Sequence, residues 1–201
     1  MEENVTLFEE EGLRIRTASV SDAKDLLAIY GPYVEKTAIS FEYEVPGEAE
    51  FAERIRNIMV RFPYLVAEDE TGIIGYAYCG IFHARKAYNH SVETSIYVDR
   101  SQKGRGIGRR LYQVLEQCLM RQHVINLYAC IAHTDLEDET LTNDSMHFHA
   151  HMGYELKGRF DRCGYKFGRW YNMIYMEKML GEHGAHPEPF IPFNELKYQE
   201  F

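Results

Sequence analysis

The chain has 201 residues, of which 45% are hydrophobic and 13% aromatic, and this length and composition suit one domain with a buried core. Its 22 basic and 31 acidic residues give a formal net charge of −9, which argues against binding to nucleic acid or to an anionic membrane. No segment approaches the roughly 18 consecutive apolar residues that span a membrane. The N-terminus is acidic where a signal peptide is basic, so we expect a cytoplasmic protein.

The first third of the chain is predicted to form a strand and two helices. Residues 13–17 alternate between apolar and polar side chains, as in a short strand. Ser19–Asp22 then has the spacing of a capping box, which opens a helix. Gly31-Pro32 falls inside this helix and is expected to kink or split it. A second helix is predicted between Pro46 and Pro63, and its apolar face consists of Phe51, Ile55, Ile58, Met59 and Phe62.

The middle of the chain is predicted to form three strands and a helix. Tyr64–Glu68 and Ile73–Phe82 have the pattern of a hairpin joined by an Asp-Glu-Thr-Gly turn. Ser91–Val98 is a third strand, and the helix is predicted from about Arg109 to His123. Because side chains alternate along a strand, one face of the third strand carries Val92, Thr94, Ile96 and Val98, and the other carries Glu93, Ser95 and Tyr97.

The rest of the domain alternates between strands and a helix. We predict a buried strand at Ile125–Ala132, a short helix near Asp144–Met152, and strands at Tyr154–Phe160 and Trp170–Met179. The resulting order, β-α-α-β-β-β-α-β-α-β-β, indicates a mixed α/β fold rather than a helix bundle or a β-sandwich. Residues 1–180 are assigned to this single domain.

A C-terminal extension, residues 181–201, differs from the domain in composition. It is rich in Pro, Gly and His, which is typical of a disordered tail, but it is more apolar than disorder favours. We therefore expect it to dock on its own domain or on a partner subunit through Phe190, Ile191, Phe193, Tyr198 and Phe201.

The four cysteines are widely spaced and include no Cys-x-x-Cys pair: they are Cys79, Cys118, Cys130 and Cys163. This spacing argues against both a zinc knuckle and a disulfide framework. We expect reduced thiols, and no cysteine stands in a local context that marks it as a nucleophile.

A Gly/Arg-rich loop, Gln102–Gly108, lies between the third strand and the following helix. Glycines let the backbone approach a ligand, and backbone N–H groups at a helix N-terminus attract an anion. A Walker A loop would need Gly-Lys-Ser/Thr, which is absent. A dinucleotide fingerprint starting at Gly104 would need glycine where Arg109 stands. The loop therefore either binds a phosphate of another class or is simply a turn.

The loop resembles the acyl-CoA diphosphate loop of the GNAT superfamily of N-acetyltransferases, and the rest of the chain resembles its phosphinothricin N-acetyltransferase branch. The similarity extends in order from about residue 13 to 180 over eight blocks. These blocks are Ile29-Tyr30, Ser40-Phe41-Glu42, Phe62–Glu68, Gly75–Tyr78, Arg85–Tyr88, Ser91–Val98, His149-x-x-x-Gly153-Tyr154 and Gly164-Tyr-Lys166-Phe-Gly168-x-Trp170.

This resemblance implies the GNAT fold, in which acetyl-CoA lies between two strands that diverge in a V-shaped split of a mixed sheet. It also implies a homodimer, a small amine as acceptor and no metal cofactor. Main-chain N–H groups of residues 96–98 are expected to polarise the thioester carbonyl. The cofactor-binding residues that it implies are Ile96, Tyr97, Val98, Lys103, Gly104, Arg105, Gly106, Ile107, Gly108, Arg109 and Ser145.

Glu93 is the candidate general base. It stands in mid-strand, where a buried strand more often carries an apolar side chain, and the resemblance assigns deprotonation of the amine to this glutamate. A glutamate needs a raised pKa, or a bridging water, to act in this way. The alternative is a structural glutamate paired with a basic neighbour on an exposed face.

Two further catalytic candidates come from the resemblance, His149 and Tyr112. His149 matches a proposed catalytic histidine, and Tyr112 matches a tyrosine that can protonate or orient the leaving thiolate. His149 also belongs to a His-x-His-x-His run, which raises the alternative of a metal site. However, only His147 and His151 share a helix face, and there is no His-Glu-x-x-His motif. Either residue can also be merely structural.

The resemblance assigns acceptor binding to Phe41, Arg85, Tyr88 and Lys166. Two cations suit an amino acid that carries acidic groups, and phosphinothricin and methionine sulfone or sulfoximine are the acceptors that the family implies. The net negative charge of the chain instead favours a cationic acceptor, so a polyamine, an aminoglycoside or a protein N-terminus stays an alternative. A third hypothesis is an acyl-CoA sensor without turnover.

Overall fold

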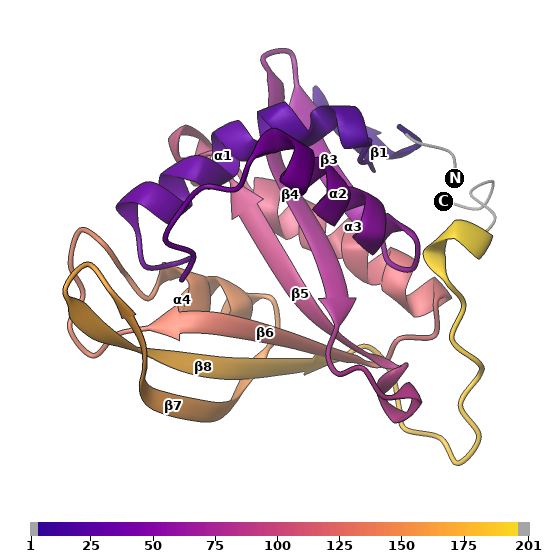
Figure 1. Ribbon diagram of the computed structural model, residues 1–201. Coiled ribbons are helices and arrows are strands. Elements are labelled where there is room, and N and C mark those ends of the chain that lie inside the picture. The colour runs from indigo at the N-terminus through magenta and orange to yellow at the C-terminus, as the bar shows by residue number, and fades with distance from the viewer. Residues whose placement is uncertain (1–3, 197–201) are drawn as a thin grey trace.

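An eight-stranded sheet in the order β1-β2-β3-β4-β5-β6-β8-β7 forms the frame of the computed structural model, which describes residues 4–196 (Figure 1). Neighbouring strands are antiparallel except β5 and β6, which are parallel. The strands are β1 (Thr6–Glu10), β2 (Leu13–Thr17), β3 (Tyr64–Asp69), β4 (Gly72–Ile81), β5 (Ser91–Val98), β6 (Asn126–His133), β7 (Glu155–Lys166) and β8 (Arg169–Met179).

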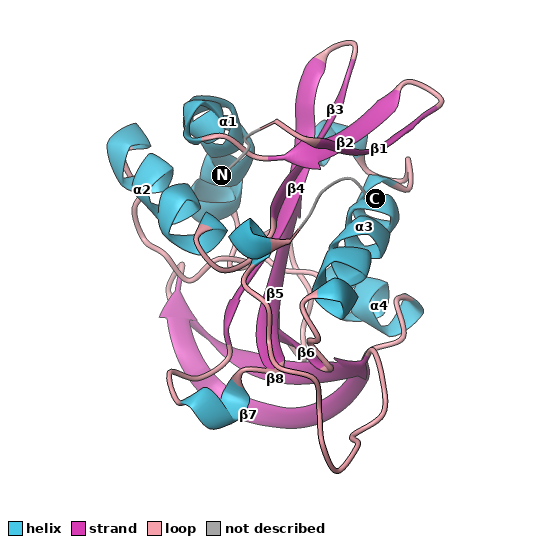
Figure 2. Ribbon diagram, turned by 90° about the vertical axis from the view of Figure 1, so that its right-hand side faces the viewer, coloured by secondary structure: helices cyan, strands magenta, loops and turns pink. Residues whose placement is uncertain are grey.

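Two helices cover each face of the sheet (Figure 2). The helices α1 (Ala23–Lys36) and α2 (Glu48–Met59) lie on one face, and α3 (Ile107–Arg121) and α4 (Asp144–His151) lie on the other. Each pair closes its own apolar core against the strands. Within residues 4–196, no helix is long and apolar enough to cross a bilayer.

The element order predicted from the sequence is confirmed with one addition, the strand β1 at the sheet edge. Its half-buried residues, Leu7 and Phe8, are adjacent rather than alternating, and its register with β2 is irregular. The period-2 pattern that predicts a strand is therefore missing.

Of the two outcomes predicted for Gly31-Pro32, a kink or a split, the split is wrong, because α1 runs through Pro32. The capping box at Ser19 is present as predicted and caps the short 3₁₀ turn that leads into α1. A proline inside a helix costs about 3 kcal/mol. Each large apolar side chain that α1 buries on the sheet, such as Leu26 or Ile29, contributes about 1.5–3 kcal/mol. Packing therefore outweighs the local preference.

The strands β5 and β6 diverge after a short common stretch. They pair only where Ser91–Glu93 runs beside Asn126–Tyr128, and Figure 1 shows their far ends pointing apart. Beyond this point β5 stays paired with β4, and β6 with β8. The V-shaped split implied by the resemblance is thus present, and Glu93 lies at its apex.

The C-terminal segment packs across the end of α3 and the loop after α2. Phe193 is fully buried in the core beneath α3, and its N–H donates to the Arg61 carbonyl at 2.9 Å. The Gln122 side chain donates to both the Arg61 and Ile191 carbonyls, and Phe190 lies over the Arg61 guanidinium at 4.5 Å. Tyr198 and Phe201, which we also expected to dock, lie outside the described residues.

Replacing Phe193 by alanine is expected to lower the free energy of unfolding by about 3–5 kcal/mol, because it empties a buried aromatic site. Chemical denaturation followed by circular dichroism measures this loss. Leu136→Ala is the control, since Leu136 is 72% exposed and its loss changes stability by at most about 0.5 kcal/mol. Equal stability of the two variants would show that the segment lies outside the core.

Candidate active site

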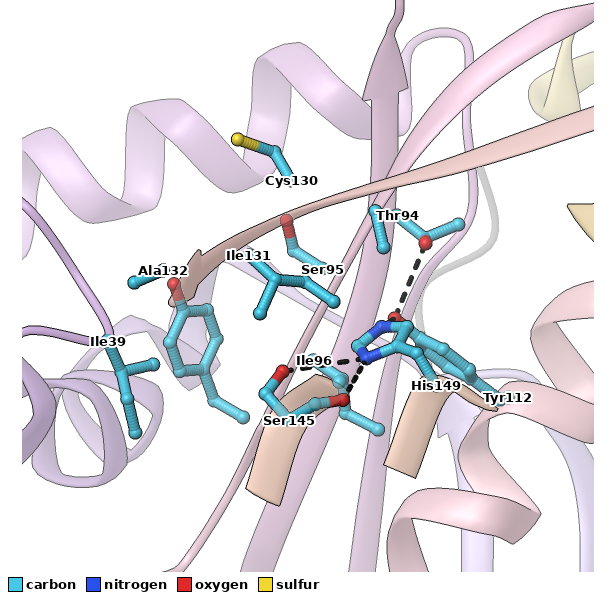
Figure 3. A pocket seen from close by; sticks show the side chains of 12 residues that line it. Ile39, Thr94, Ser95, Ile96, Tyr112, Cys130, Ile131, Ala132, Ser145 and His149 are labelled. Atoms are coloured by element: carbon cyan, nitrogen blue, oxygen red, sulfur yellow. Dashed lines mark hydrogen bonds between the residues drawn. The ribbon is translucent and has the colours of Figure 1, made fainter. Parts of the chain in front are cut away.

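A small cleft of about 60 Å³ lies in the gap between β5 and β6. Among the described residues, the β5 backbone beyond Glu93 has no partner strand on this side, so its N–H and C=O groups can bind a ligand. Figure 3 shows the cleft, which is lined by Ile39, Thr94, Ser95, Ile96, Tyr97, Tyr112, Ala129, Cys130, Ile131, Ala132, Ser145 and His149.

A hydrogen-bonded pair, Tyr112 and His149, forms the side of the cleft that faces α3 and α4 (Figure 3). His149 Nδ1 lies 2.7 Å from the Ser145 carbonyl oxygen, which can only accept, so Nδ1 carries the proton. Nε2 is then free to accept from the Tyr112 hydroxyl at 3.0 Å. Burial lowers the pKa of His149 to about 4, so its ring is neutral at pH 7.

Thr94 connects this pair to the rest of the gap. Its hydroxyl lies 3.3 Å from the Tyr112 hydroxyl and 3.1 Å from the Tyr154 hydroxyl, and it donates to the Tyr128 carbonyl. Burial raises the pKa of Tyr112 above its ordinary value, so this phenol keeps its proton. Tyr112 is thus a neutral O–H donor that lines the cleft, with its one proton directed at His149 Nε2.

Glu93 lies on the opposite face of β5, as the predicted alternation requires. It is half-buried, and Tyr175 of β8 donates a hydrogen bond to its Oε2 at 3.2 Å. Burial raises the pKa of the Glu93 carboxyl, an effect that the Tyr175 bond and nearby His83 oppose. A carboxylate with a raised pKa is suited to accept a proton near neutral pH.

The glycine-rich loop leads directly into α3, as the sequence predicts. Gly104 and Gly106 have φ values of +82° and +77°, a region that side chains with a Cβ rarely adopt. A Cβ at Gly108 would press on the Phe148 ring at 3.3 Å. The helix starts one residue after Gly106, so its unpaired N–H groups and positive end face the loop.

The basic side chains around the loop point in different directions. Lys103 reaches Asp144, the first residue of α4, at 3.3 Å, whereas Arg105 pairs with Asp69 at 2.9 Å. Arg109 lines a second cleft of about 450 Å³ between the start of α3 and the β1–β2 hairpin. Only Lys103 therefore points toward the α4 side, where Ser145 also lies.

Three of the predicted acceptor residues lie on loops: two on the β4–β5 connection near the apex, and one beside the β7–β8 hairpin toward the open end of the gap. Arg85 and Tyr88 are exposed on the β4–β5 connection, six and three residues before β5 begins. Phe41 lies on the α1–α2 connection and packs against the β7–β8 hairpin, so closely that a Cβ at Gly164 would overlap its ring.

The fourth, Lys166, is placed differently from our expectation. It is 3% exposed, and its ammonium donates to the carbonyls of Val34, Thr37 and Ser40 at 2.7, 3.0 and 2.7 Å. All three of its N–H donors are occupied, so none is left for an acceptor carboxylate. Lys166 instead holds the start of the α1–α2 connection against β7.

Sequence reasoning missed Tyr175 and Thr94 as members of this site. Tyr175 is brought to Glu93 only because β8 pairs with β6. Its position in the alternating pattern of β8 does not indicate a partner three strands earlier in the chain. Within residues 4–196, no three His, Cys, Asp or Glu side chains are grouped as metal ligands.

The chain matches the model of the acetyltransferase (GNAT) domain over residues 15–175. The chain belongs to the acetyltransferase (GNAT) family. This acetyltransferase is 30% identical to the phosphinothricin N-acetyltransferase of Streptomyces viridochromogenes, over 94% of this chain and 98% of that one. It is 34% identical to the L-methionine sulfoximine/L-methionine sulfone acetyltransferase of Pseudomonas aeruginosa, over 83% and 94% of the two chains.

A solved structure extends the comparison of this acetyltransferase to the fold. The phosphinothricin acetyltransferase of Sinorhizobium meliloti in complex with AcCoA superimposes with a TM-score of 0.80 at 31% identity, covering 94% of this chain and all of the other. The diverging strands and the loop before α3 thus belong to a fold in which a relative holds acetyl-CoA.

Replacing Lys166 by methionine is expected to lower the free energy of unfolding by about 3 kcal/mol or more, because three buried carbonyls lose their donor. Urea denaturation measures this change in the free energy of unfolding. Lys157→Met is the control, because Lys157 makes only exposed or partly exposed ion pairs. If the Lys166 variant were as stable as the control and bound the acceptor more weakly, Lys166 would be a substrate residue after all.

The buried His149 is expected to make stability depend on pH. Its pKa is lowered from 6.5 to about 4, so the unfolded state binds the extra proton first. The contribution of the neutral His149 ring to the free energy of unfolding is complete above pH 6.5. It falls by about 3 kcal/mol as the pH drops toward 4. Urea denaturation of wild type and His149→Gln across this range isolates the effect. Parallel curves for the two proteins would contradict it.

Proposed function

We propose that this protein transfers the acetyl group of acetyl-CoA directly to the amine of a small amino-acid-like acceptor. The transfer takes place in a ternary complex of the protein, acetyl-CoA and the acceptor. The observation that carries the proposal is Glu93, a half-buried carboxylate of raised pKa at the apex of the β5–β6 gap. The relatives named for phosphinothricin and for methionine sulfoximine or sulfone support this class of acceptor.

The diphosphate of acetyl-CoA binds the loop Lys103–Arg109. Backbone N–H groups and the positive end of α3 attract it, and Lys103 adds a charge on the α4 side beside Ser145. The rest of the coenzyme then lies along the gap. There, the N–H groups of Ile96 and Val98, which point away from β4, polarise the thioester carbonyl and stabilise the oxyanion that forms.

Glu93 removes a proton from the ammonium of the acceptor, directly or through one water. The freed nitrogen lone pair attacks the thioester carbon, and the C–S bond of the resulting tetrahedral intermediate breaks. Coenzyme A leaves as a thiolate, and the Tyr112 hydroxyl turns from His149 Nε2 to donate its one hydrogen bond to the sulfur. The nitrogen loses its second proton to the departing sulfur, so the products are an amide and the free thiol of coenzyme A. The first proton stays on Glu93 until it is lost to water.

His149 positions Tyr112 in this scheme. A ring whose pKa is about 4 holds no second proton at pH 7, so it cannot act as an imidazolium acid. Its bare Nε2 instead holds the Tyr112 hydroxyl in place. Tyr112 itself acts as a hydrogen-bond donor, because burial raises its pKa well above that of a thiol.

The acceptor binds on the Glu93 face, with Arg85 placed for its carboxylate and Tyr88 and Phe41 for its apolar parts. The homodimer is also part of the proposal. Exposed aromatic side chains on β7 and β8 support it, since such clusters mark interaction surfaces; they are Phe160, Tyr165 and Trp170. A cytoplasmic location stays a prediction from the sequence.

Glu93→Gln is expected to lower kcat at least about 100-fold, because general-base catalysis contributes this much or more. It should leave the affinity for acetyl-CoA unchanged. Release of free thiol from acetyl-CoA, measured over a panel of small amines, gives the rate, and calorimetric titration with CoA gives the affinity. Glu177→Gln is the matched control, a half-buried carboxylate two strands away on the same sheet face.

Turnover of any amine excludes the alternative of an acyl-CoA sensor. An equal rate for wild type and Glu93→Gln would show that Glu93 is not the base. Strong binding of CoA without thiol release for any amine would favour the sensor.

A further inference from the structure

A third cleft, of about 330 Å³, lies between α2 and the strands β3 and β4. We call it the tyrosine cleft, because three stacked tyrosines line it: Tyr64, Tyr76 and Tyr78. The ring centroids of Tyr64 and Tyr78 are 4.8 Å apart, with planes 11° from parallel. Glu42 and Arg54 also line the cleft. The reaction described above uses none of these residues.

Two of the tyrosine hydroxyls have no partner among the described residues. Tyr64 and Tyr76 are 2% and 1% exposed, yet neither makes a hydrogen bond, whereas the neighbouring Tyr30 bonds Ser40. Burial raises the pKa of both well above the ordinary value, so both O–H groups are present as donors. Neither hydroxyl oxygen is among the fully buried polar atoms that lack a partner, so both are open to the cleft, where a ligand with hydrogen-bond acceptors can bind them.

The charges at the cleft disfavour an anionic ligand. Arg54 is held by Glu42 at 2.7 Å and by Glu50 at 2.6 Å, so its charge is already matched by two carboxylates. Together the three groups carry one negative charge. A carboxylate or phosphinate entering here would be repelled rather than paired.

The tyrosine cleft is adjacent to the proposed base. Gly80 of β4 pairs with Glu93, and Tyr78 pairs with Ser95 two residues further along β5. Tyr78 is therefore a diagonal neighbour of Glu93 on the same sheet face, a separation of roughly 7–8 Å between backbones. A Cβ built at Gly80 would meet nothing within 4 Å, so open space lies over β4 between Glu93 and the cleft. Tyr64 lies across from Tyr78 on β3, and Tyr76 lies two residues further along β4, so an extended acceptor that starts at Glu93 enters the cleft at Tyr78.

We propose that the tyrosine cleft binds the side chain of the acceptor and selects an uncharged side chain that carries hydrogen-bond acceptors. The inference rests on the proposed function, in which the acceptor amine meets Glu93. Tyr64 and Tyr76 donate to the distal oxygen or nitrogen atoms of the side chain. Methionine sulfone and sulfoximine have such a group, whereas the side chain of phosphinothricin ends in an anion and that of methionine has only a weakly accepting thioether.

Three acceptors of similar length test this selection: L-methionine sulfone, phosphinothricin and L-methionine. We expect kcat/KM for the sulfone to exceed the other two about tenfold or more, which is the effect of two neutral hydrogen bonds. The double variant Tyr64→Phe/Tyr76→Phe should raise KM for the sulfone about tenfold and leave kcat and the KM for acetyl-CoA unchanged. Its KM for L-methionine should not change. Tyr165→Phe is the control, a tyrosine outside the cleft.

Thermal unfolding separates recognition from a structural role. Because the two hydroxyls are unpaired, their removal should leave the melting temperature unchanged or raise it. A lower melting temperature with unchanged discrimination would overturn the proposal, and so would equal kcat/KM for the sulfone and phosphinothricin in the wild type.

A binding measurement distinguishes failure of the tyrosine-cleft proposal from failure of the proposed acetyl transfer. If no amine is turned over, calorimetric titration of the CoA-bound protein with L-methionine sulfone still tests the cleft. Binding that the double variant weakens would support the cleft without the reaction, and no difference between wild type and double variant would overturn it.

Discussion

The divergence of β5 from β6 is the constraint on which the rest of the structure depends. Two parallel strands would normally pair along their length, but these pair only from Ser91 to Glu93 on the β5 side. Each keeps a full antiparallel partner on its outer edge, β4 or β8, so the sheet holds together without the inner pairing. Tyr97 packs its ring against Tyr30 and Tyr33 of α1, which ties β5 to one half of the sheet. The gap exposes backbone N–H and C=O groups that need partners. It also forms an opening between the two faces of the sheet, beginning beside Glu93.

Burial around the β5–β6 gap shifts the pKa values of three titratable side chains in different directions. It raises the pKa of Glu93, lowers that of His149 and raises that of Tyr112, because a low-dielectric site disfavours whichever form carries the charge. One physical cause thus yields a more basic carboxylate on one face and a neutral imidazole–phenol pair on the other. The face with Glu93 suits deprotonation of an amine, and the face with Tyr112 suits a departing thiolate. β5 separates the two chemistries by the alternation of its side chains.

Much of the fold could be predicted because local patterns and packing agree. The alternation in β5 correctly separates Glu93 from Thr94, and the glycines before α3 correctly mark a strand–loop–helix unit. The errors arise where packing prevails over local preference. Pro32 stays inside α1 because the helix buries its apolar face, and β1 forms with no alternating pattern because β2 offers it an edge. Lys166 has the charge of a substrate residue, but three carbonyls that converge from a loop far away in sequence take up its donors.

The amino-acid sequence by itself determined the mixed α/β class, the phosphate-type loop before α3 and the residue types at the apex, because each of these is written in a local pattern of a few residues. Only the tertiary structure decided which of them meet. Tyr175 reaches Glu93 through the pairing of β8 with β6, and Tyr64 and Tyr76 become unpaired donors through the packing of α2 over β3 and β4. Hydrogen-bond partners and burial depend on chain segments that are distant in sequence, and no local pattern encodes the distance between them.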